Sequence, residues 1–159
     1  MKLKRKCLAH YLDSTFGGSG TPKWFLVGKD IEEMNVELNP DVETKKNILG
    51  ESLAEDNGYT PSIEADPYYA NPDDEIYEKL LDIAMNRREG DECKTQLLEV
   101  IIEDPTAEAH KAWIEDVILK PKSYGGSSYV NIPYDIYFAG NRQEGTVAIA
   151  NKVPTFTAN

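Results

Sequence analysis

The feature that most limits how this chain can fold is an alternation of apolar and polar residues that recurs in short segments. The clearest case is residues 130–139, whose alternate apolar positions are Ile132, Tyr134, Ile136 and Phe138. Residues 31–38 alternate in the same way through Met34, Val36 and Leu38. A period of two is typical of β-strands with one buried face. Further apolar-rich runs lie at 6–12, 24–27, 93–103, 112–120 and 145–150. The chain is therefore predicted to be mainly β, an antiparallel sandwich or barrel.

One α-helix interrupts the strands, at about residues 72–88. Asn71 is a good N-cap, and Pro72 suits the first helical position. Arg87 and Arg88 suit the negative end of the helix dipole, and Gly90 is expected to end the helix. Apolar residues at helical spacing form one face: Ile76, Tyr77, Leu80, Leu81, Ala84 and Met85. We expect this face to pack on a sheet of the same subunit.

Clusters of Gly, Pro and Asn mark the connections between these elements. Residues 15–22, with three glycines, are predicted to form a flexible loop. Asn39-Pro40-Asp41 and Gly140-Asn141-Arg142 are each predicted to form a turn, and Gly125-Gly126 is read as a hairpin signal.

Residues 50–70, before the helix, form an acidic segment rich in turn-forming residues. We expect a long loop there, or a small hairpin in which Asn57-Gly58 turns 52–56 against 59–63. The segment nevertheless carries five large apolar or aromatic residues without an evident core position: Leu53, Tyr59, Ile63, Tyr68 and Tyr69. These five are candidate contacts to another subunit or ring, and the segment is predicted to become ordered on assembly.

Charge is distributed unevenly along the 159 residues, whose net charge is −11. Residues 1–29 hold six basic groups and one acid, a net charge of +5, so the rest carries −16. A basic end on an acidic body indicates either a solvated tail or head-to-tail association between copies. On the second interpretation, the assembly contacts are Lys4, Arg5 and Lys6. The negative net charge argues against a protein that binds DNA through phosphate contacts.

Little in the sequence indicates catalysis or metal binding. His10 and His110 lack neighbouring ligands at the spacing of a zinc site, and residues 17–20 lack the spacing of a phosphate loop. The acidic pairs at 103–104 and 115–116 are read as solvated strand ends, because such pairs arise by chance in so acidic a chain. We therefore expect no enzyme activity, metal or cofactor.

The two cysteines, Cys7 and Cys93, are too few for a disulfide framework and are expected to be free thiols, with a single disulfide as the alternative. Apolar stretches are too short to span a membrane. The basic start is followed by residues too polar for a signal peptide, so synthesis in the cytoplasm is expected.

The order of these segments resembles the bacteriophage major tail tube protein family, which is related to tube subunits of contractile bacteriocins and type VI secretion tubes. The resemblance covers most of residues 5–150. It rests on residues 45–52 (KKNILGES), 71–77 (NPDDEIY), 112–117 (AWIEDV) and 134–147 (YDIYFAGNRQEGTV), the last closing as Gly-Asn-Arg-x-x-Gly-Thr.

The resemblance implies one domain, residues 1–159, with an N-terminal arm at 1–6, the long loop at 50–70 and a C-terminal arm at 151–159. Copies would join into rings, usually of six, and the rings would stack into a tube through which DNA passes without specific binding. Expected partners are further copies and tail terminator, tape-measure and baseplate-type proteins. The protein would be made in the host cytoplasm and end in the virion tail. Contractile and noncontractile tails both remain open.

Two other classes of function are weighed against this one. A β-sandwich binding module for a carbohydrate or peptide would use Trp24 or Trp113 as an exposed platform, although Trp113, between Ala112 and Ile114, looks like a core residue. A small hydrolase would need its scattered carboxylates to converge in one pocket.

Overall fold

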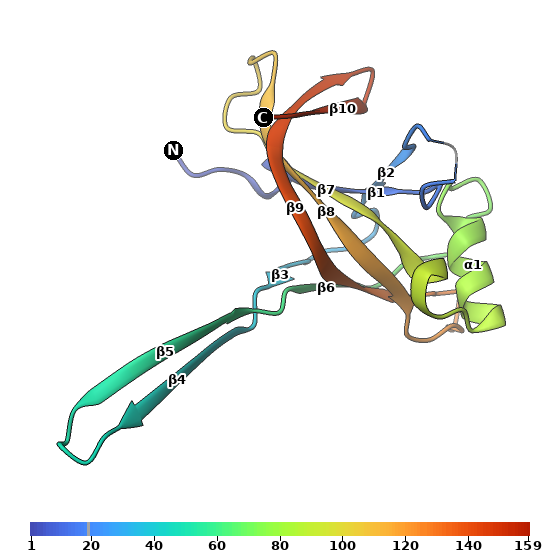
Figure 1. Cartoon of the computed structure of the whole chain (residues 1–159). Helices are drawn as coiled ribbons and strands as arrows, with labels where there is room; N and C mark the ends of the chain where they lie inside the picture. Colours follow the sequence, from blue (N-terminus) through green and yellow to red (C-terminus); the bar gives the residue numbers. More distant parts are fainter. Residues whose placement is uncertain (19) are drawn as a thin grey trace.

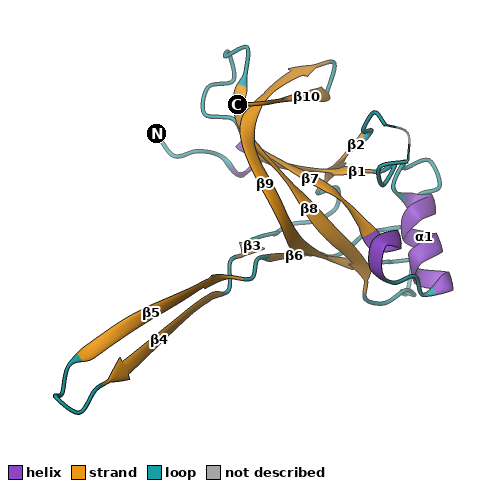
Figure 2. Ribbon diagram, viewed as in Figure 1, coloured by secondary structure: helices purple, strands orange, loops and turns teal. Residues whose placement is uncertain are grey.

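The computed structural model describes residues 1–18 and 20–159. Within these residues lie ten strands and one α-helix, arranged as a curled sheet with a long hairpin projecting from it (Figure 1; Figure 2). The strands are β1 (Leu8–Asp13), β2 (Trp24–Val27), β3 (Val36–Glu37), β4 (Pro40–Lys46), β5 (Ser52–Tyr59), β6 (Ser62–Ala65), β7 (Lys94–Ile101), β8 (His110–Pro121), β9 (Tyr134–Ala150) and β10 (Val153–Ala158). The helix is α1 (Tyr77–Asn86), and two 3₁₀ turns are η1 (Arg5–Cys7) and η2 (Gly90–Cys93). The predicted mainly β, antiparallel fold with one flanking α-helix is confirmed.

The main sheet has the order β2-β1-β7-β8-β9-β6-β3, and β10 pairs with β9. It buries apolar residues on both faces, because successive residues of a strand point to opposite sides. Leu97 belongs to the apolar cluster that includes Leu80 of α1, whereas the adjacent Leu98 belongs to the cluster that includes Val147. The molecule therefore has two apolar clusters of its own, one under α1 and one enclosed by the curl of the sheet.

The predicted turn at Gly140-Asn141-Arg142 is wrong, because β9 runs through it from Tyr134 to Ala150. Gly140 and Asn141 have positive φ angles of 103° and 57°, and the pairing of β9 with β8 shifts register there. Both features identify a β-bulge, which bends a strand and increases its twist. Such a bend suits the curved path of β9 in Figure 1.

The segment at 50–70 is not a long loop, because β5 and β6 occupy most of it. The hairpin turn lies at residues 47–51 rather than at Asn57-Gly58, and β5 pairs with β4. Asn57 and Gly58 instead lie inside β5, where the pairing with β4 shifts register. Asn39, with φ of 48°, immediately precedes β4 rather than forming a hairpin turn.

The helix is shorter than predicted. The Asn71 side chain accepts a hydrogen bond from the Asp73 N–H at 3.0 Å, so it stabilises a turn before α1 rather than capping α1 itself. Arg87, with φ of 51°, ends the helix before Gly90 is reached. Leu80 and Ile83 are buried against the sheet, and Met85 faces solvent.

Other predicted elements differ mainly at their ends. The strands expected at 24–27, 93–103 and 112–120 are β2, β7 and β8. Of residues 31–38, only Val36–Glu37 pairs as a strand. The Gly125-Gly126 signal lies in a longer connection between β8 and β9 that is joined by one Gly125–Asn131 bridge. The expected loop at 15–22 includes Ser19, which lies outside the described residues.

The C-terminal residues fold back as β10, which pairs with β9. Asn151 and Lys152, both with positive φ, make a two-residue turn that places β10 antiparallel to β9. The Phe156 side chain lies over Gly145 so closely that an added Cβ there would meet the ring at 2.6 Å. Gly145 is therefore required for β10 to pack.

Candidate assembly surfaces

The β4–β5 hairpin is the part of the molecule that its own chain does not bury. It projects away from the curled sheet in Figure 1, and every side chain from Pro40 to Tyr59 is exposed. Within the described residues, the two strands pair only with each other. Because an isolated two-stranded hairpin is only marginally stable in water, this one would gain stability from a partner surface.

The tip of the hairpin is a well-ordered turn that presents two aliphatic side chains to solvent. Asn47 organises the turn, because its side-chain oxygen accepts hydrogen bonds from the N–H groups of Leu49 at 2.9 Å and Glu51 at 3.1 Å. Ile48 is 102% exposed and Leu49 is 76% exposed. The tip is therefore a hydrogen-bonded turn with an exposed apolar surface.

The two faces of the hairpin differ in character. Residues opposite each other across the strands share a face, so Glu43, Lys45, Leu53 and Glu55 lie together. On that face Lys45 Nζ lies 3.6 Å from Glu43 and 3.3 Å from Glu55. The other face carries smaller residues in its middle and a charged residue towards each end: Val42, Thr44, Lys46, Ser52, Ala54 and Asp56. Because the ion pairs are exposed, they contribute only ~0–1 kcal/mol each, and the hairpin is held mainly by its backbone pairing.

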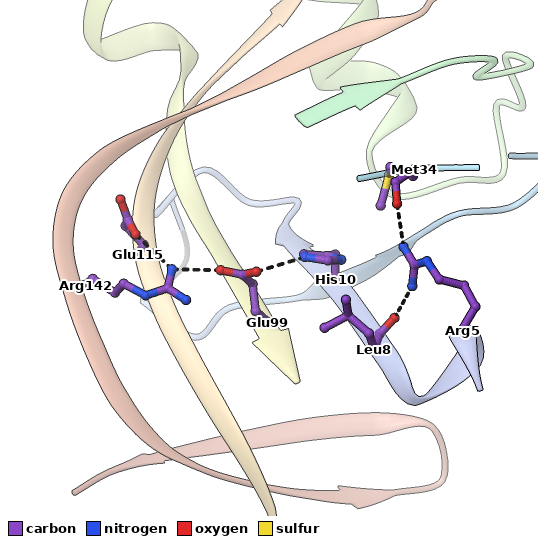
Figure 3. Close-up of polar contacts among 7 residues, drawn as sticks. All are labelled: Arg5, Leu8, His10, Met34, Glu99, Glu115 and Arg142. Atoms are coloured by element: carbon purple, nitrogen blue, oxygen red, sulfur yellow. Dashed lines mark hydrogen bonds and ion pairs between the residues drawn. The ribbon is translucent and has the colours of Figure 1, made fainter. Parts of the chain in front are cut away.

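The basic residues predicted as assembly contacts have different environments. Arg5 is fixed to the body, because its guanidinium donates hydrogen bonds to the carbonyl oxygens of Leu8 at 2.6 Å and Met34 at 3.0 Å (Figure 3). Lys4 and Lys6 are exposed and form no ion pair within the described residues. Arg5 thus attaches the N-terminal segment to the sheet, while the two lysines face solvent.

A cavity of about 560 Å³ lies beside the β1–β2 edge. Its lining combines apolar residues, among them Leu26 and Ile31, with the basic residues Arg5, Lys6 and Lys29. The only acid of its lining within the described residues is Glu32. Three of the six basic residues of positions 1–29 therefore line one cavity.

A chain of charged side chains crosses four strands of the sheet (Figure 3). His10 Nε2 lies 3.0 Å from Glu99 Oε2, and Glu99 Oε1 accepts a hydrogen bond from Arg142 at 2.7 Å. The same nitrogen of Arg142 donates to Glu115 at 3.0 Å. Glu115 in turn accepts the Gly140 N–H at the bulge, at 3.1 Å. The chain of charges thus joins β1, β7, β8 and β9, and it holds the bulge.

The partners in this chain set its ionisation. Burial alone would raise the pKa of Glu99, but hydrogen bonds from His10 and Arg142 lower that pKa below its ordinary value. Burial alone would lower the pKa of Arg142, but hydrogen bonds to Glu99 and Glu115 raise it. These charges therefore stabilise one another, and their arrangement is structural.

A second cavity, of about 420 Å³, lies at the root of the hairpin. Its walls are apolar and include Leu38, Tyr59, Pro61 and Phe138. Its lining also includes Glu99, Glu115 and Arg142 of the charged chain. This hairpin-root cavity therefore has a mainly apolar lining with one group of charged residues.

The acidic pair at 103–104, considered in the sequence as a candidate for catalysis or metal binding, forms structural contacts. Glu103 pairs with Lys111 at 2.8 Å, and Asp104 accepts the Thr106 N–H at 3.0 Å. In the described parts of the chain, no three His, Cys, Asp or Glu residues are grouped as metal ligands. Both cysteines are free thiols. None of the described helices is long and apolar enough to cross a membrane.

Comparison with known proteins relies on structure, because no family model and no curated protein matches the sequence. The chain is similar to a sheath/tube terminator of the extracellular contractile injection system PVC, with TM-score 0.53 and 10% identity over 91% of this chain and 96% of that one. It is also similar to the tube-terminating cap of the anti-feeding prophage, with TM-score 0.55 and 12% identity over 92% of each chain. The SPP1 tail tube protein matches with TM-score 0.56 and 11% identity, over 95% of this chain and 82% of that one. The chain has the fold of tail tube and tube-terminator proteins.

On this tail tube fold, the five residues predicted as inter-subunit contacts do not lie together. Ile63 and Tyr68 are buried in the chain's own core, so the expectation that they lack a core position is wrong for both. Tyr68 packs edge-on against Phe25 and Tyr134 and donates a hydrogen bond to Asp74 at 3.0 Å.

The other three residues are exposed, so their role as contacts stays a prediction. Leu53 lies near the tip of the hairpin and Tyr59 at its root. Tyr69 stacks obliquely on Tyr129, with ring centroids 5.6 Å apart. Sequence reasoning missed the tip residues Ile48 and Leu49. Their signal was two adjacent aliphatic residues followed by Gly50, a pattern hidden by the assignment of the turn to Asn57-Gly58.

Proposed function

We propose that this protein is a structural subunit of a phage or phage-like tail tube, assembling with further copies into stacked rings that form a conduit for DNA. The observation that carries the proposal is the exposed β4–β5 hairpin on a tail tube fold whose body already has its own core. A body that is complete in one copy does not need the hairpin, so the hairpin is available for contacts between copies.

The edges of the sheet support ring formation. Strand β2 lies at one edge of the main sheet, and β3 and β10 lie at the other side. Unpaired strand edges are templates for pairing with another chain. Pairing between unlike edges is a heterologous contact, and such contacts close into rings when the rotation between copies permits.

The net charge of −11 suits a conduit for DNA. A negatively charged wall repels phosphate, whereas every Lys or Arg contact would add affinity and slow transit. On this proposal most ionisable residues facing the pore are Asp or Glu. The subunit would contact tail terminator, tape-measure and baseplate-type proteins at the tube ends, and it would act without enzyme activity.

A second candidate function is that of the terminator itself, because two of the three similar structures are a tube terminator and a terminating cap. The TM-scores of 0.53, 0.55 and 0.56 do not separate the two roles. The roles differ physically in how many ring faces accept another ring of the same protein. A tube subunit must use both faces, whereas a terminator ends the stack.

The alternative of a binding module that uses an exposed tryptophan has less support. Trp24 and Trp113 are both half-buried. The Arg142 guanidinium also lies over the Trp113 ring, with its Cζ atom 5.9 Å from the ring centroid. Neither ring is an open platform. Trp113 is not the fully buried core residue expected from the sequence either.

Negative-stain electron microscopy of the concentrated protein tests these roles. A tube subunit gives tubes with an axial repeat of stacked rings, and a terminator gives single rings that do not lengthen with concentration. Protein that stays monomeric at every concentration and salt condition contradicts both. A tube whose pore is lined mainly by Lys and Arg would contradict the acidic conduit while leaving the tube role intact.

A further inference from the structure

The Asn57-Gly58 pair has no role in the fold described so far, because it neither forms a turn nor lies on a buried face. It lies at the register shift of the β4–β5 ladder, where Asp41 is the single residue of β4 opposite both of them. Two residues opposite one are the pattern of a β-bulge, which leaves the extra residue unpaired. The pair is therefore a local interruption of β5 on an exposed hairpin.

The two groups that could react with each other in this pair are both weakly held. The Gly58 N–H donates a hydrogen bond to the exposed Asp56 carboxylate at 2.9 Å, and Gly58 has no paired residue in β4. Asn57 is exposed, and its side chain makes no hydrogen bond to any other described residue. A hydrogen bond to an exposed side chain contributes little, because water replaces it readily. The side-chain amide of Asn57 is therefore free to turn towards the Gly58 nitrogen.

We propose that Asn57 is a site of spontaneous deamidation through a succinimide. The Gly58 nitrogen gives its proton to a base in the solvent and bonds to the side-chain carbonyl carbon of Asn57. The bond from that carbon to the amide nitrogen breaks, and the nitrogen takes up a proton and leaves as ammonia. Water then opens the five-membered ring at either carbonyl, which gives aspartate or isoaspartate. One water is consumed and one ammonia is released, so no oxidant or reductant is required.

The residue that follows each asparagine singles out this position. Glycine has no side chain to cover its nitrogen or to restrict the backbone, so the ring can close. Asn57 is the single asparagine of the sequence that is followed by glycine. Asn39 and Asn71 precede proline, which has no N–H to lose.

Asn141 is a matched comparison within the same chain, because it also lies at a bulge. Its side chain donates a hydrogen bond to Asp116 at 2.8 Å, which holds the amide away from the next nitrogen. The next residue is Arg142, whose side chain is fixed by Glu99. The two bulges are thus alike in the backbone but opposite in how firmly they hold the asparagine, and we expect only Asn57 to react readily.

The product changes the β4–β5 pairing within one copy. A new carboxylate at position 57 lies opposite Asp41 and next to Asp56, and like charges across a strand pair destabilise it. Isoaspartate also routes the main chain through the former side-chain carbon, which lengthens β5 at the bulge. This inference does not depend on the tube function, because every step takes place in a single subunit.

Peptide mapping by mass spectrometry, after incubation of the folded protein at neutral pH, tests the proposal. The peptide that contains Asn57 should gain about one dalton, and labelling by an isoaspartate methyltransferase should locate isoaspartate there. The peptide that contains Asn141 should react at least about tenfold more slowly. No mass gain at Asn57, or equal rates at the two positions, would overturn the proposal.

Incubation of the same protein in urea separates the effect of the fold from that of the Asn-Gly pair. Because nothing in the fold holds Asn57, its rate in the folded protein should be within about tenfold of its rate in the unfolded chain. A larger reduction on folding would show that the hairpin protects the residue, against the proposal.

Anion-exchange chromatography of an Asn57→Gln variant provides a second readout. Glutamine keeps the amide and the charge, but its reaction requires a six-membered ring, which closes more slowly. The parent should accumulate a species that is more negative by one charge, and the variant should not. The same species accumulating equally fast in Asn57→Gln would assign the reaction to another amide and refute the proposal.

Discussion

The curled body and the β4–β5 hairpin are built from the same kind of antiparallel pairing but are stabilised in different ways. The body buries both faces of its sheet, with residues such as Leu97 and Leu98 fully enclosed on opposite sides. The hairpin buries neither face. The body is stabilised by its own contacts, whereas the hairpin is not. On the proposed function, stability and assembly would therefore be separated, and the hairpin would serve contacts between copies.

Removing the hairpin is the strongest test of this separation. Pro40 and Tyr59 are cross-strand partners at its root, so residues 41–58 can be replaced by Gly-Gly without opening the body. We expect the variant to fold with an unfolding free energy within about 1 kcal/mol of the parent, because no removed side chain is buried. Electron microscopy should show no tubes. Tubes from this variant would show that the hairpin is not an assembly contact, and loss of folding would show that the body depends on it.

Amide hydrogen exchange compares the two regions within one molecule. In monomers, β4 and β5 should exchange rapidly, because an isolated hairpin opens at almost no cost, while β7 and β8 exchange at the rate of global unfolding. In assembled protein, protection should rise in β4 and β5. Strong protection of the hairpin in a proven monomer would contradict the view that it lacks stability of its own.

Replacing one leucine in each region by alanine compares how much a side chain of the body and a side chain of the hairpin contribute to the unfolding free energy. Leu80→Ala removes a fully buried side chain between α1 and the sheet, and should lower the unfolding free energy by about 2–5 kcal/mol. Leu53→Ala removes an exposed side chain from the hairpin and should change it by less than about 0.5 kcal/mol. Urea unfolding of both variants as monomers gives the comparison. Similar losses in the two would mean that the hairpin packs on the body in solution.

The sequence predicted the fold class and the helix because both depend on local periodicity. It failed where the same residue types serve two structures. Asn57-Gly58 and Gly140-Asn141 were read as turns, yet both lie at register shifts within strands. Turns and bulges alike need residues that tolerate positive φ, so only the distant partner strand decides between them.

The candidate surfaces were predicted less well, for a related reason. Tyr68 was assigned to a partner, but Phe25 and Tyr134, remote in sequence, enclose it. The charged chain was not foreseen, because His10 and Glu99 are 89 positions apart and Arg142 lies 43 beyond Glu99. Adjacent strands bring these residues together, and no short spacing in the sequence signals it.

The smallest expected effect concerns pH, and it also distinguishes the two regions. The pKa of Glu99 is lowered in the folded body by its hydrogen bonds to His10 and Arg142, so the carboxylate stabilises the fold above its ordinary pKa of about 4.5. That contribution is lost as the pH falls from about 4.5 through the lowered pKa of the folded state, because the unfolded chain then takes up the proton first. Glu99→Gln should therefore be less stable than the parent at pH 7, and its unfolding free energy should fall less steeply between about pH 5 and pH 3.

Glu55→Gln is the control on the hairpin, where Glu55 forms only an exposed ion pair with Lys45. Urea unfolding of monomers across this pH range should show a flattened profile for Glu99→Gln and an unchanged one for Glu55→Gln. Parallel profiles for Glu99→Gln and the parent would show that the charged chain does not stabilise the body.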